Sequence, residues 1–187
     1  MIYSLQNIIP KELIAKIKSD VTDELLCKLS DPLGAYNRTG KSINISKTPE
    51  LTSLDAELYD FICKLSTDFV NFRYRPMFKT GDSGYEFHRY GPEDICLVHG
   101  DGEVAFAGQE NTALLRYATV VLHLNTVKNG GKTIFPNQNK SFDTVEGQVL
   151  IFPPYHAYQH YVTPSDEQRD IVMTWMVYNG ITVSKAI

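Results

Sequence analysis

Hydrophobic side chains in the first part of the chain recur at the spacing of a helix. Over residues 10–19, Leu13, Ile14 and Ile17 fall on one face, and Pro10 suits a first-turn position. A longer stretch over 52–72 repeats the pattern, with charged residues on the opposite face. The pattern predicts two helices, the longer of which packs on the back of a sheet rather than binding a partner. Its apolar face consists of Leu54, Leu58, Phe61, Ile62, Leu65 and Phe69.

The segment between the two predicted helices has the composition of a loop. Residues 30–41 read SDPLGAYNRTGK, and in the following SINIS the side chains of Ile43 and Ile45 alternate with polar ones. Alternation of this kind is typical of a half-buried strand. We therefore expect a loop from Ser30 to Lys47 that contains one short strand.

After Pro76 the chain consists of short apolar or alternating segments separated by Gly, Pro and Asn. No helical spacing occurs between them, so they predict an antiparallel sandwich or a jelly-roll barrel rather than β-α-β units. The expected fold class is mainly β with N-terminal helices. We expect one domain over 1–187, with helical support over about 1–75 and a strand-rich core over about 84–178. The predicted strands are Gly84–Tyr90, Ile95–His99, Tyr117–Leu124, Lys132–Phe135, Val149–Phe152, Ala157–Val162 and Ile171–Tyr178.

Composition and charge exclude several classes of protein. The chain is 43% hydrophobic and carries a net charge of −4, which argues against a nucleic-acid-binding surface. No apolar run approaches the roughly 18 residues that a membrane span needs, so no membrane association is expected. The N-terminal sequence has no basic segment ahead of an apolar one, which argues against a secretory signal. Three cysteines without CxxC spacing suggest neither a disulfide framework nor a zinc ribbon, so we expect a cytoplasmic protein.

The residues His99-Gly100-Asp101 are the clearest candidate for chemistry. A His-X-Asp at a strand end supplies one imidazole nitrogen and one carboxylate oxygen, and alternation turns both side chains to the same side. A second histidine on a distant strand completes a 2-His-1-carboxylate face, which leaves about three positions of an octahedral Fe(II) open. Two histidines are candidates for this third ligand, His156 and His160, and their even spacing does not separate them.

Further motifs stand before and after the His-X-Asp in a fixed order. The series is YGP (90–92), HGD (99–101), RYAT (116–119), HLN (123–125), GGKTIF (130–135), GQVLIFP (147–153) and HYVTP (160–164), ahead of Arg169 and Trp175. Over about residues 84–178 the chain therefore resembles the prolyl-4-hydroxylase-like branch of the Fe(II)/2-oxoglutarate-dependent dioxygenases. The resemblance implies a double-stranded β-helix, a cupin-like jelly roll with the metal at one open end. It also implies decarboxylation of 2-oxoglutarate to succinate and CO2, coupled to hydroxylation of a substrate C–H bond, with Fe(II), 2-oxoglutarate, O2 and optionally ascorbate.

The resemblance also implies roles for individual residues. His99, Asp101 and His160 would be the catalytic metal ligands, since the HYVTP segment matches the family's distal histidine; His156 stays as the alternative. Arg169 would bind the distal carboxylate of 2-oxoglutarate with its planar, always-charged guanidinium. The family has a Gly shortly before this arginine, where this chain has Glu167-Gln168.

Three more residues would line the co-substrate pocket. Tyr90 matches a pocket-facing tyrosine whose hydroxyl can donate to the co-substrate carboxylate, although a core tyrosine is nearly as good an interpretation. His123 stands where the family commonly has a Tyr, and it can still donate a hydrogen bond. Thr133 would point inward after the Gly130-Gly131 turn. For Trp175 a core position is favoured over a pocket wall.

The leading hypothesis is a hydroxylase of a prolyl or other amino-acid residue, acting on a peptide, a protein or a small molecule. One alternative is a 2-oxoglutarate oxygenase that acts on a different small molecule or a nucleobase. Another is a non-catalytic jelly-roll metal-binding module, against which Arg169 and the open three-ligand face both argue. The Gly100–Asn111 segment is a candidate for a substrate-covering loop, with an ordinary surface loop as an equal alternative. The pattern leaves the substrate and the oligomeric state open.

Overall fold

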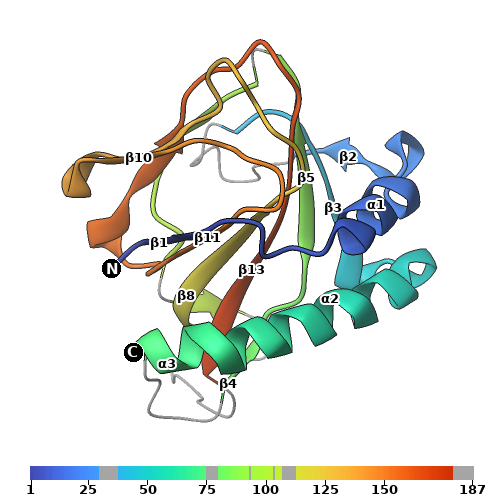
Figure 1. Ribbon diagram of the computed structural model, residues 1–187, viewed down its shortest axis with the longest axis horizontal. Coiled ribbons are helices and arrows are strands. Elements are labelled where there is room, and N and C mark those ends of the chain that lie inside the picture. Colours follow the sequence, from blue (N-terminus) through green and yellow to red (C-terminus); the bar gives the residue numbers. More distant parts are fainter. Residues whose placement is uncertain (30–37, 75–79, 93, 103, 107–112, 179–187) are drawn as a thin grey trace.

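The structure is a computed structural model that describes residues 1–29, 38–74, 80–92, 94–102, 104–106 and 113–178. Its strands form two antiparallel sheets (Figure 1). The larger sheet has the order β1-β11-β8-β13-β5-β3-β2, with β4 added beside β13 and β7 beside β8. The bounds are β1 Tyr3–Leu5, β2 Cys27–Lys28, β3 Lys41–Asn44, β4 Thr80–Asp82, β5 Glu86–Tyr90, β7 Val104–Phe106, β8 Ala113–His123, β11 Val149–Phe152 and β13 Arg169–Tyr178.

The smaller sheet has the order β10-β9-β12-β6 and lies against the inner face of the larger one. Its strands are β6 Cys96–His99, β9 Thr133–Phe135, β10 Lys140–Phe142 and β12 His160–Val162. From β5 onward the chain passes repeatedly between the two sheets, with β6, then β9 and β10, then β12 in the smaller sheet and the strands between them in the larger one, as in a jelly roll. The predicted fold class, mainly β with N-terminal helices, is confirmed.

The helices cover the outer face of the larger sheet. They are α1 Lys11–Asp20, α2 Thr52–Leu65 and α3 Asn71–Tyr74, and a π-helical turn over Ser66–Val70 joins α2 to α3. In Figure 1, α2 passes across the lower ends of β8 and β13. Short 3₁₀ turns occur at Asp23–Leu25, Ile45–Lys47, Pro49–Leu51, Pro136–Gln138 and His156–Tyr158.

Strand alternation gives the larger sheet two different faces. On β8, Ala118, Val120 and Leu122 are fully buried against the helices, together with Leu54 and Leu58 of α2. Thr119, Val121 and His123 point the other way, into the space between the sheets. Each Leu or Val buried in this way contributes about 1.5–3 kcal/mol, so the helix–sheet layer holds the larger sheet rigid while its inner face remains available for chemistry.

Most predicted elements are present with small differences in their ends. The helix predicted over 52–72 continues past Leu65 as a π-helical turn, and the strand predicted from Ile171 begins two residues earlier at Arg169. The first half of the strand predicted over Ala157–Val162 is instead a 3₁₀ turn. It follows Pro153-Pro154, which cannot donate backbone hydrogen bonds, and the chain closes a turn through Tyr158 N–H to the Tyr155 carbonyl, 2.8 Å. Of the segment predicted to be a substrate-covering loop, 103 and 107–111 lie outside the described residues, and Val104–Phe106 forms β7.

Candidate metal centre and co-substrate pocket

His99 is turned into the space between the sheets by a bulge in β6. The pairing of β6 with β12 matches His99 to His160 and Cys96 to Val162, so three steps on β6 face two on β12. The extra residue leaves Leu97 and Val98 both exposed, at 46% and 54%, while Cys96 and His99 are both buried. It also brings the Leu97 carbonyl to the ring of His99, which donates from Nδ1 at 2.7 Å. The bond leaves Nε2 of His99 directed into the cavity.

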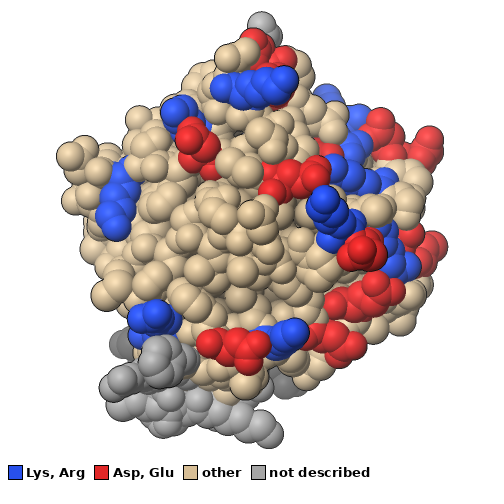
Figure 2. All heavy atoms as spheres, viewed as in Figure 1, with Lys and Arg blue, Asp and Glu red and all other residues tan. Residues whose placement is uncertain are grey.

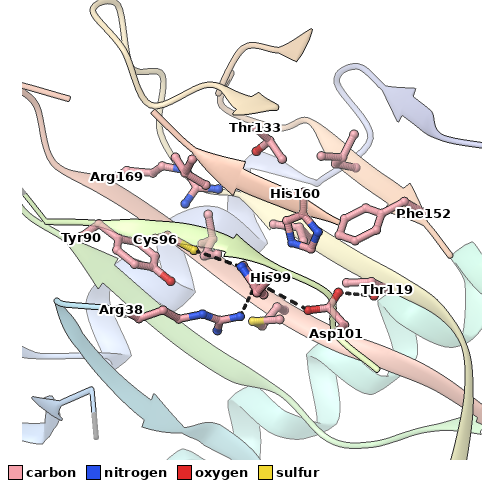
Figure 3. A pocket seen from close by; sticks show the side chains of 15 residues that line it. Arg38, Tyr90, Cys96, His99, Asp101, Thr119, Thr133, Phe152, His160 and Arg169 are labelled. Carbon is pink, nitrogen blue, oxygen red and sulfur yellow. Dashed lines mark hydrogen bonds and ion pairs between the residues drawn. The ribbon is translucent and has the colours of Figure 1, made fainter. Parts of the chain in front are cut away.

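His160 is the histidine that faces His99. It begins β12, is 7% exposed, and its ring centroid lies 4.4 Å from that of His99 (Figure 3). Its Nδ1 also donates to a backbone carbonyl two residues earlier, that of Tyr158, at 3.2 Å. Both imidazoles are therefore held in the tautomer that presents Nε2 to the cavity. His156, the alternative third ligand, lies in the exposed 3₁₀ turn before β12.

Asp101 supplies the carboxylate of the same cluster. Its Oδ2 accepts a 2.6 Å hydrogen bond from the Thr119 hydroxyl on β8, and its backbone carbonyl accepts one of 2.7 Å from Arg116. Its Oδ1 lies 3.9 Å from Nε2 of His99. One donor atom from each of His99, Asp101 and His160 lies within 4.8 Å of the others. Two imidazole nitrogens and one oriented carboxylate on one side of a cavity fit the facial set that binds Fe(II).

The three side chains have the protonation states that a metal requires. Burial lowers the pKa of His99 to about 4, and the cationic Arg38 contributes to the shift. Burial also lowers the pKa of His160. Although burial opposes ionisation of Asp101, the pKa of its carboxyl is lowered by His160 and by the Thr119 hydrogen bond. At neutral pH the cluster consists of two neutral imidazoles and one carboxylate, which can bind a divalent cation without first losing protons.

Arg169 begins β13 on the inner face of the larger sheet and lines the same cavity as the three candidate ligands. It is 4% exposed, and burial lowers the pKa of its guanidinium, which nevertheless stays charged. Its Nε donates to the Thr144 hydroxyl at 3.2 Å, and in the described part of the chain no carboxylate forms an ion pair with it. A buried cation without a counter-ion is costly, so the arrangement favours an anionic ligand.

Asp170, the next residue of β13, has an ion-pair partner among the described residues, in contrast to Arg169. Asp170 points to the other face of the strand, where the Arg89 guanidinium binds it with two hydrogen bonds of 3.0 and 2.9 Å. The acidic side chain closest to Arg169 in sequence is therefore occupied by a different arginine. Alternation along β13 keeps the Arg169 guanidinium available to the cavity.

Tyr90 and Thr133 lie where the sequence predicted them, in the wall of the cavity. Tyr90 ends β5 opposite Arg169, whose guanidinium carbon lies 5.4 Å from the centroid of its ring. Thr133 begins β9 and is held by the turn before it. At Gly130, φ is +77° and an added Cβ would lie 1.9 Å from the Pro164 carbonyl oxygen, so only glycine fits this contact between the β9 and β12 ends.

His123 has a different environment from the other predicted pocket residues. It ends β8 on the inner face, but it is fully buried and is not among the residues that line the cavity. Burial and the nearby Arg169 lower its pKa to about 3, so its ring is neutral. Gln148 is close enough to interact with the ring, although no hydrogen bond of good geometry to His123 is present. A co-substrate contact to His123 requires the ring or Gln148 to move.

The sequence interpretation assigned no role to Thr119 or Arg38, which line the cavity and contact two of the candidate ligands. Thr119 orients Asp101 and belongs to the RYAT motif. Its polar side chain on the inner face of β8 could have identified it as a site residue. Arg38 lies in a segment interpreted only as loop. Its guanidinium lines the cavity, and one guanidinium nitrogen lies 2.5 Å from Nε2 of His99. The cavity has a volume of about 30 Å³. Nothing in the loop composition predicted this position.

The surface agrees with the acidic composition. Figure 2 shows acidic and basic side chains mixed along the borders of one face, where α1 and α2 lie, and no continuous basic patch among the residues drawn in colour there. In the described part of the chain, no helix has both the length and the apolar character needed to cross a bilayer.

Comparison with known proteins identifies relatives in structure. No protein-family model matches the chain, and no curated protein matches it in sequence. The structure is similar to a viral collagen prolyl hydroxylase from Paramecium Bursaria Chlorella virus-1 in complex with 2-oxoglutarate, with a TM-score of 0.71 and 18% identity over 95% of this chain and 96% of that one.

Two further solved structures extend the comparison. A prolyl hydroxylase from Trichoplax adhaerens, in complex with a hypoxia inducible factor peptide, has a TM-score of 0.65 and 15% identity over 94% and 83% of the two chains. HygX from Streptomyces hygroscopicus, with nickel and 2-oxoglutarate bound, has a TM-score of 0.64 and 11% identity over 97% and 84%; a second structure of it also holds hygromycin B. The jelly roll predicted from the motif series is therefore confirmed: the chain has the fold of the prolyl-hydroxylase-like 2-oxoglutarate oxygenases.

Proposed function

We propose that the protein is an Fe(II)- and 2-oxoglutarate-dependent dioxygenase that hydroxylates a C–H bond of a prolyl or other amino-acid residue. One observation carries the proposal. The three-donor cluster and a buried arginine without a carboxylate partner among the described residues line one cavity. A structural metal site would be closed by a fourth protein ligand and would have no use for a buried cation nearby. A metal-bound co-substrate with a second, distant carboxylate uses both features.

In this proposal His99, Asp101 and His160 hold Fe(II), while His156 stays outside the site. When bound, the metal supplies the activation of dioxygen and of the 2-oxo acid that the protein side chains cannot provide. The protein contributes orientation. The backbone carbonyls at Leu97 and Tyr158 fix the two imidazoles, and the Thr119 hydroxyl fixes the carboxylate.

Arg169 binds the far carboxylate of 2-oxoglutarate with its guanidinium fork. Tyr90 and Thr133 form the walls beside it, while His123 is buried near Arg169 outside the cavity lining. The sheet layers around these groups exclude water, which strengthens the attraction between the guanidinium and the carboxylate. Arg38 has to turn away from Nε2 of His99 when the metal binds, which its long side chain permits.

The substrate is proposed to be a peptide or protein, in line with the peptide bound to the Trichoplax enzyme. A small-molecule substrate is the second candidate, since HygX has the same fold and has been solved with hygromycin B. Peptide and small-molecule substrates differ in what the cavity mouth must accommodate, and both reactions consume 2-oxoglutarate.

Titration of Mn(II), a redox-silent substitute for Fe(II), with 2-oxoglutarate tests the proposal. We expect metal binding to fall at least about 100-fold in His99→Ala, Asp101→Ala and His160→Ala and to persist in His156→Ala, the matched control on the exposed turn. With Fe(II) and O2, the wild type should convert 2-oxoglutarate to succinate slowly even without substrate. If the wild-type protein binds the metal but does not bind 2-oxoglutarate, it is a metal-binding module instead. Loss of metal binding in His156→Ala but not His160→Ala would reassign the third ligand.

A further inference from the structure

Three polar side chains form a row on the inner face of β5. Glu86, His88 and Tyr90 are two residues apart, so all three point to the same side of the strand. Nε2 of His88 lies 3.2 Å from a carboxylate oxygen of Glu86, and its Nδ1 lies 3.4 Å from the Tyr90 hydroxyl oxygen. His88 is 2% exposed, and its ring is stacked with that of Tyr90 at an interplanar angle of 19°. The row links a partly exposed carboxylate to a wall of the proposed co-substrate pocket.

The chemistry of the three groups determines the direction of the hydrogen bonds. An ionised carboxylate only accepts, so the contact with Glu86 requires a hydrogen on Nε2 of His88. In a neutral imidazole, Nδ1 is then a bare acceptor, and the Tyr90 hydroxyl has to donate to it. The hydroxyl hydrogen of Tyr90 is therefore donated to His88 and does not point into the cavity. Only the lone pairs of the hydroxyl oxygen are available to a group in the cavity.

The surroundings of the row favour a charged Glu86. The hydrogen bond from His88, the electrostatic interaction with His88 and the nearby guanidinium groups of Arg116 and Arg38 lower the pKa of Glu86, so its carboxylate is charged and accepts from Nε2 of His88. The surroundings of the Tyr90 hydroxyl, at the other end of the row, also suit a hydrogen-bond acceptor. Arg38 and Arg169 both lie near enough to Tyr90 to act on it electrostatically, and both carry only N–H donors.

We infer that Glu86 and His88 are positioning residues that turn the hydroxyl hydrogen of Tyr90 away from the cavity, so that Tyr90 accepts hydrogen bonds there and does not donate them. Anion recognition at this end of the pocket is then assigned to Arg169 rather than shared with Tyr90. The consequence for 2-oxoglutarate rests on the proposed function, whereas the hydrogen-bond direction in the row does not.

The tautomer of His88 can be measured directly. Long-range ¹H–¹⁵N correlation spectra of ¹⁵N-histidine-labelled protein loaded with Zn(II) distinguish the protonation of each ring nitrogen among the five histidines. We expect His88 to be protonated at Nε2 only. In Glu86→Gln the amide can itself donate to Nε2, so the Nδ1–H form should gain population, while Glu50→Gln, an exposed control, should leave the spectrum of His88 as in the wild type. A wild-type His88 protonated at Nδ1, or at both nitrogens, would overturn the inference.

A second measurement connects the row to the co-substrate. His88→Leu removes the acceptor and frees the Tyr90 hydroxyl to donate to a bound carboxylate, so we expect 2-oxoglutarate to bind about tenfold tighter in the presence of Mn(II). Adding Tyr90→Phe should abolish this gain. Equal affinities of His88→Leu and wild type would contradict the inference. If the wild type binds no 2-oxoglutarate at all, the proposed function fails, and the histidine spectra still decide the direction of the row.

Discussion

His99 and His160 face each other across directly paired positions of β6 and β12, with ring centroids 4.4 Å apart. Each ring donates from Nδ1 to the carbonyl two residues before it, so the same local device orients both imidazoles. The spacing of the two Nε2 atoms is therefore set by strand pairing, before any ligand is present. Preorganisation of this kind lowers the entropic cost of metal binding.

Thr119 is expected to control metal affinity without touching the metal. Its 2.6 Å hydrogen bond holds the Asp101 carboxylate, and loss of such an outer contact typically costs 10–100-fold. Thr119→Val should weaken Mn(II) binding by about this factor, measured by calorimetry. Thr174→Val is the matched control, because Thr174 is equally buried and its hydroxyl has no hydrogen-bond partner among the described residues. Equal losses in both variants would point to a general packing effect.

Arg169 should affect stability and co-substrate binding in opposite directions. Its buried charge lacks an ion-pair partner in the described chain, so Arg169→Met should raise the free energy of unfolding of the ligand-free protein by about 1–3 kcal/mol. The same variant should weaken 2-oxoglutarate binding about 100-fold, because a charge-assisted fork is lost. Urea unfolding and calorimetry measure the two effects. A variant that is less stable than the wild type would show that the guanidinium has a structural role instead.

Arg38 is expected to compete with the metal. Its guanidinium lies 2.5 Å from Nε2 of His99, and two like charges at a few ångströms repel strongly even at an effective dielectric constant of about 20. Arg38→Ala should therefore increase Mn(II) affinity by about tenfold when 2-oxoglutarate is absent. Arg73→Ala on the exposed side of α3 controls for the loss of one positive charge. An unchanged affinity in Arg38→Ala would mean that the guanidinium leaves the site at no cost.

His123 should make the protein sensitive to acid. Its pKa is lowered to about 3 in the folded state, against about 6.5 in an unfolded chain, so below pH 6.5 the unfolded chain binds a proton that the folded one does not. The free energy of unfolding should fall as the pH falls, by about 2 kcal/mol between pH 7 and 5 from this residue alone. His123→Gln should remove that part of the pH dependence, measured by urea unfolding at several pH values. Parallel pH curves for the two proteins would contradict the prediction.

The sequence predicted the helix from Thr52, whose apolar spacing repeats several times, and the strand Val149–Phe152, a continuous apolar run bounded by turn residues. It did not predict β1, β2, β4, β7 or β10, because strands of two or three residues are too short to show a period and no motif marks these five as GGKTIF marks β9 and HYVTP marks β12. The bulge in β6 could not be predicted from the sequence either, because the exposure of both Leu97 and Val98 depends on the pairing with β12. His99, Asp101, His160 and Arg169, which the motif series singled out, line one cavity, and their roles there stay predictions.

The remaining site residues needed three-dimensional information. Arg38 reaches the cavity from a segment far from the other motifs, and no local pattern marks it. The row from Glu86 to Tyr90 is visible in the sequence as alternate polar residues, but its hydrogen-bond direction depends on distances across the strand face. His123 occupies a motif position, yet its burial behind Arg169 depends on how closely the two sheets pack.

The alternation of Arg169 and Asp170 on β13 makes the pocket unusually sensitive to changes in chain length. A one-residue insertion or deletion in the turn between Val162 and Arg169 that shifted β13 by one position would exchange the two side chains. The cavity would then hold a carboxylate and repel the proposed anionic co-substrate, while Arg89 would lose Asp170 and keep only Asp23 as an ion-pair partner among the described residues. We therefore expect related sequences to vary in composition across this turn far more freely than in its number of residues.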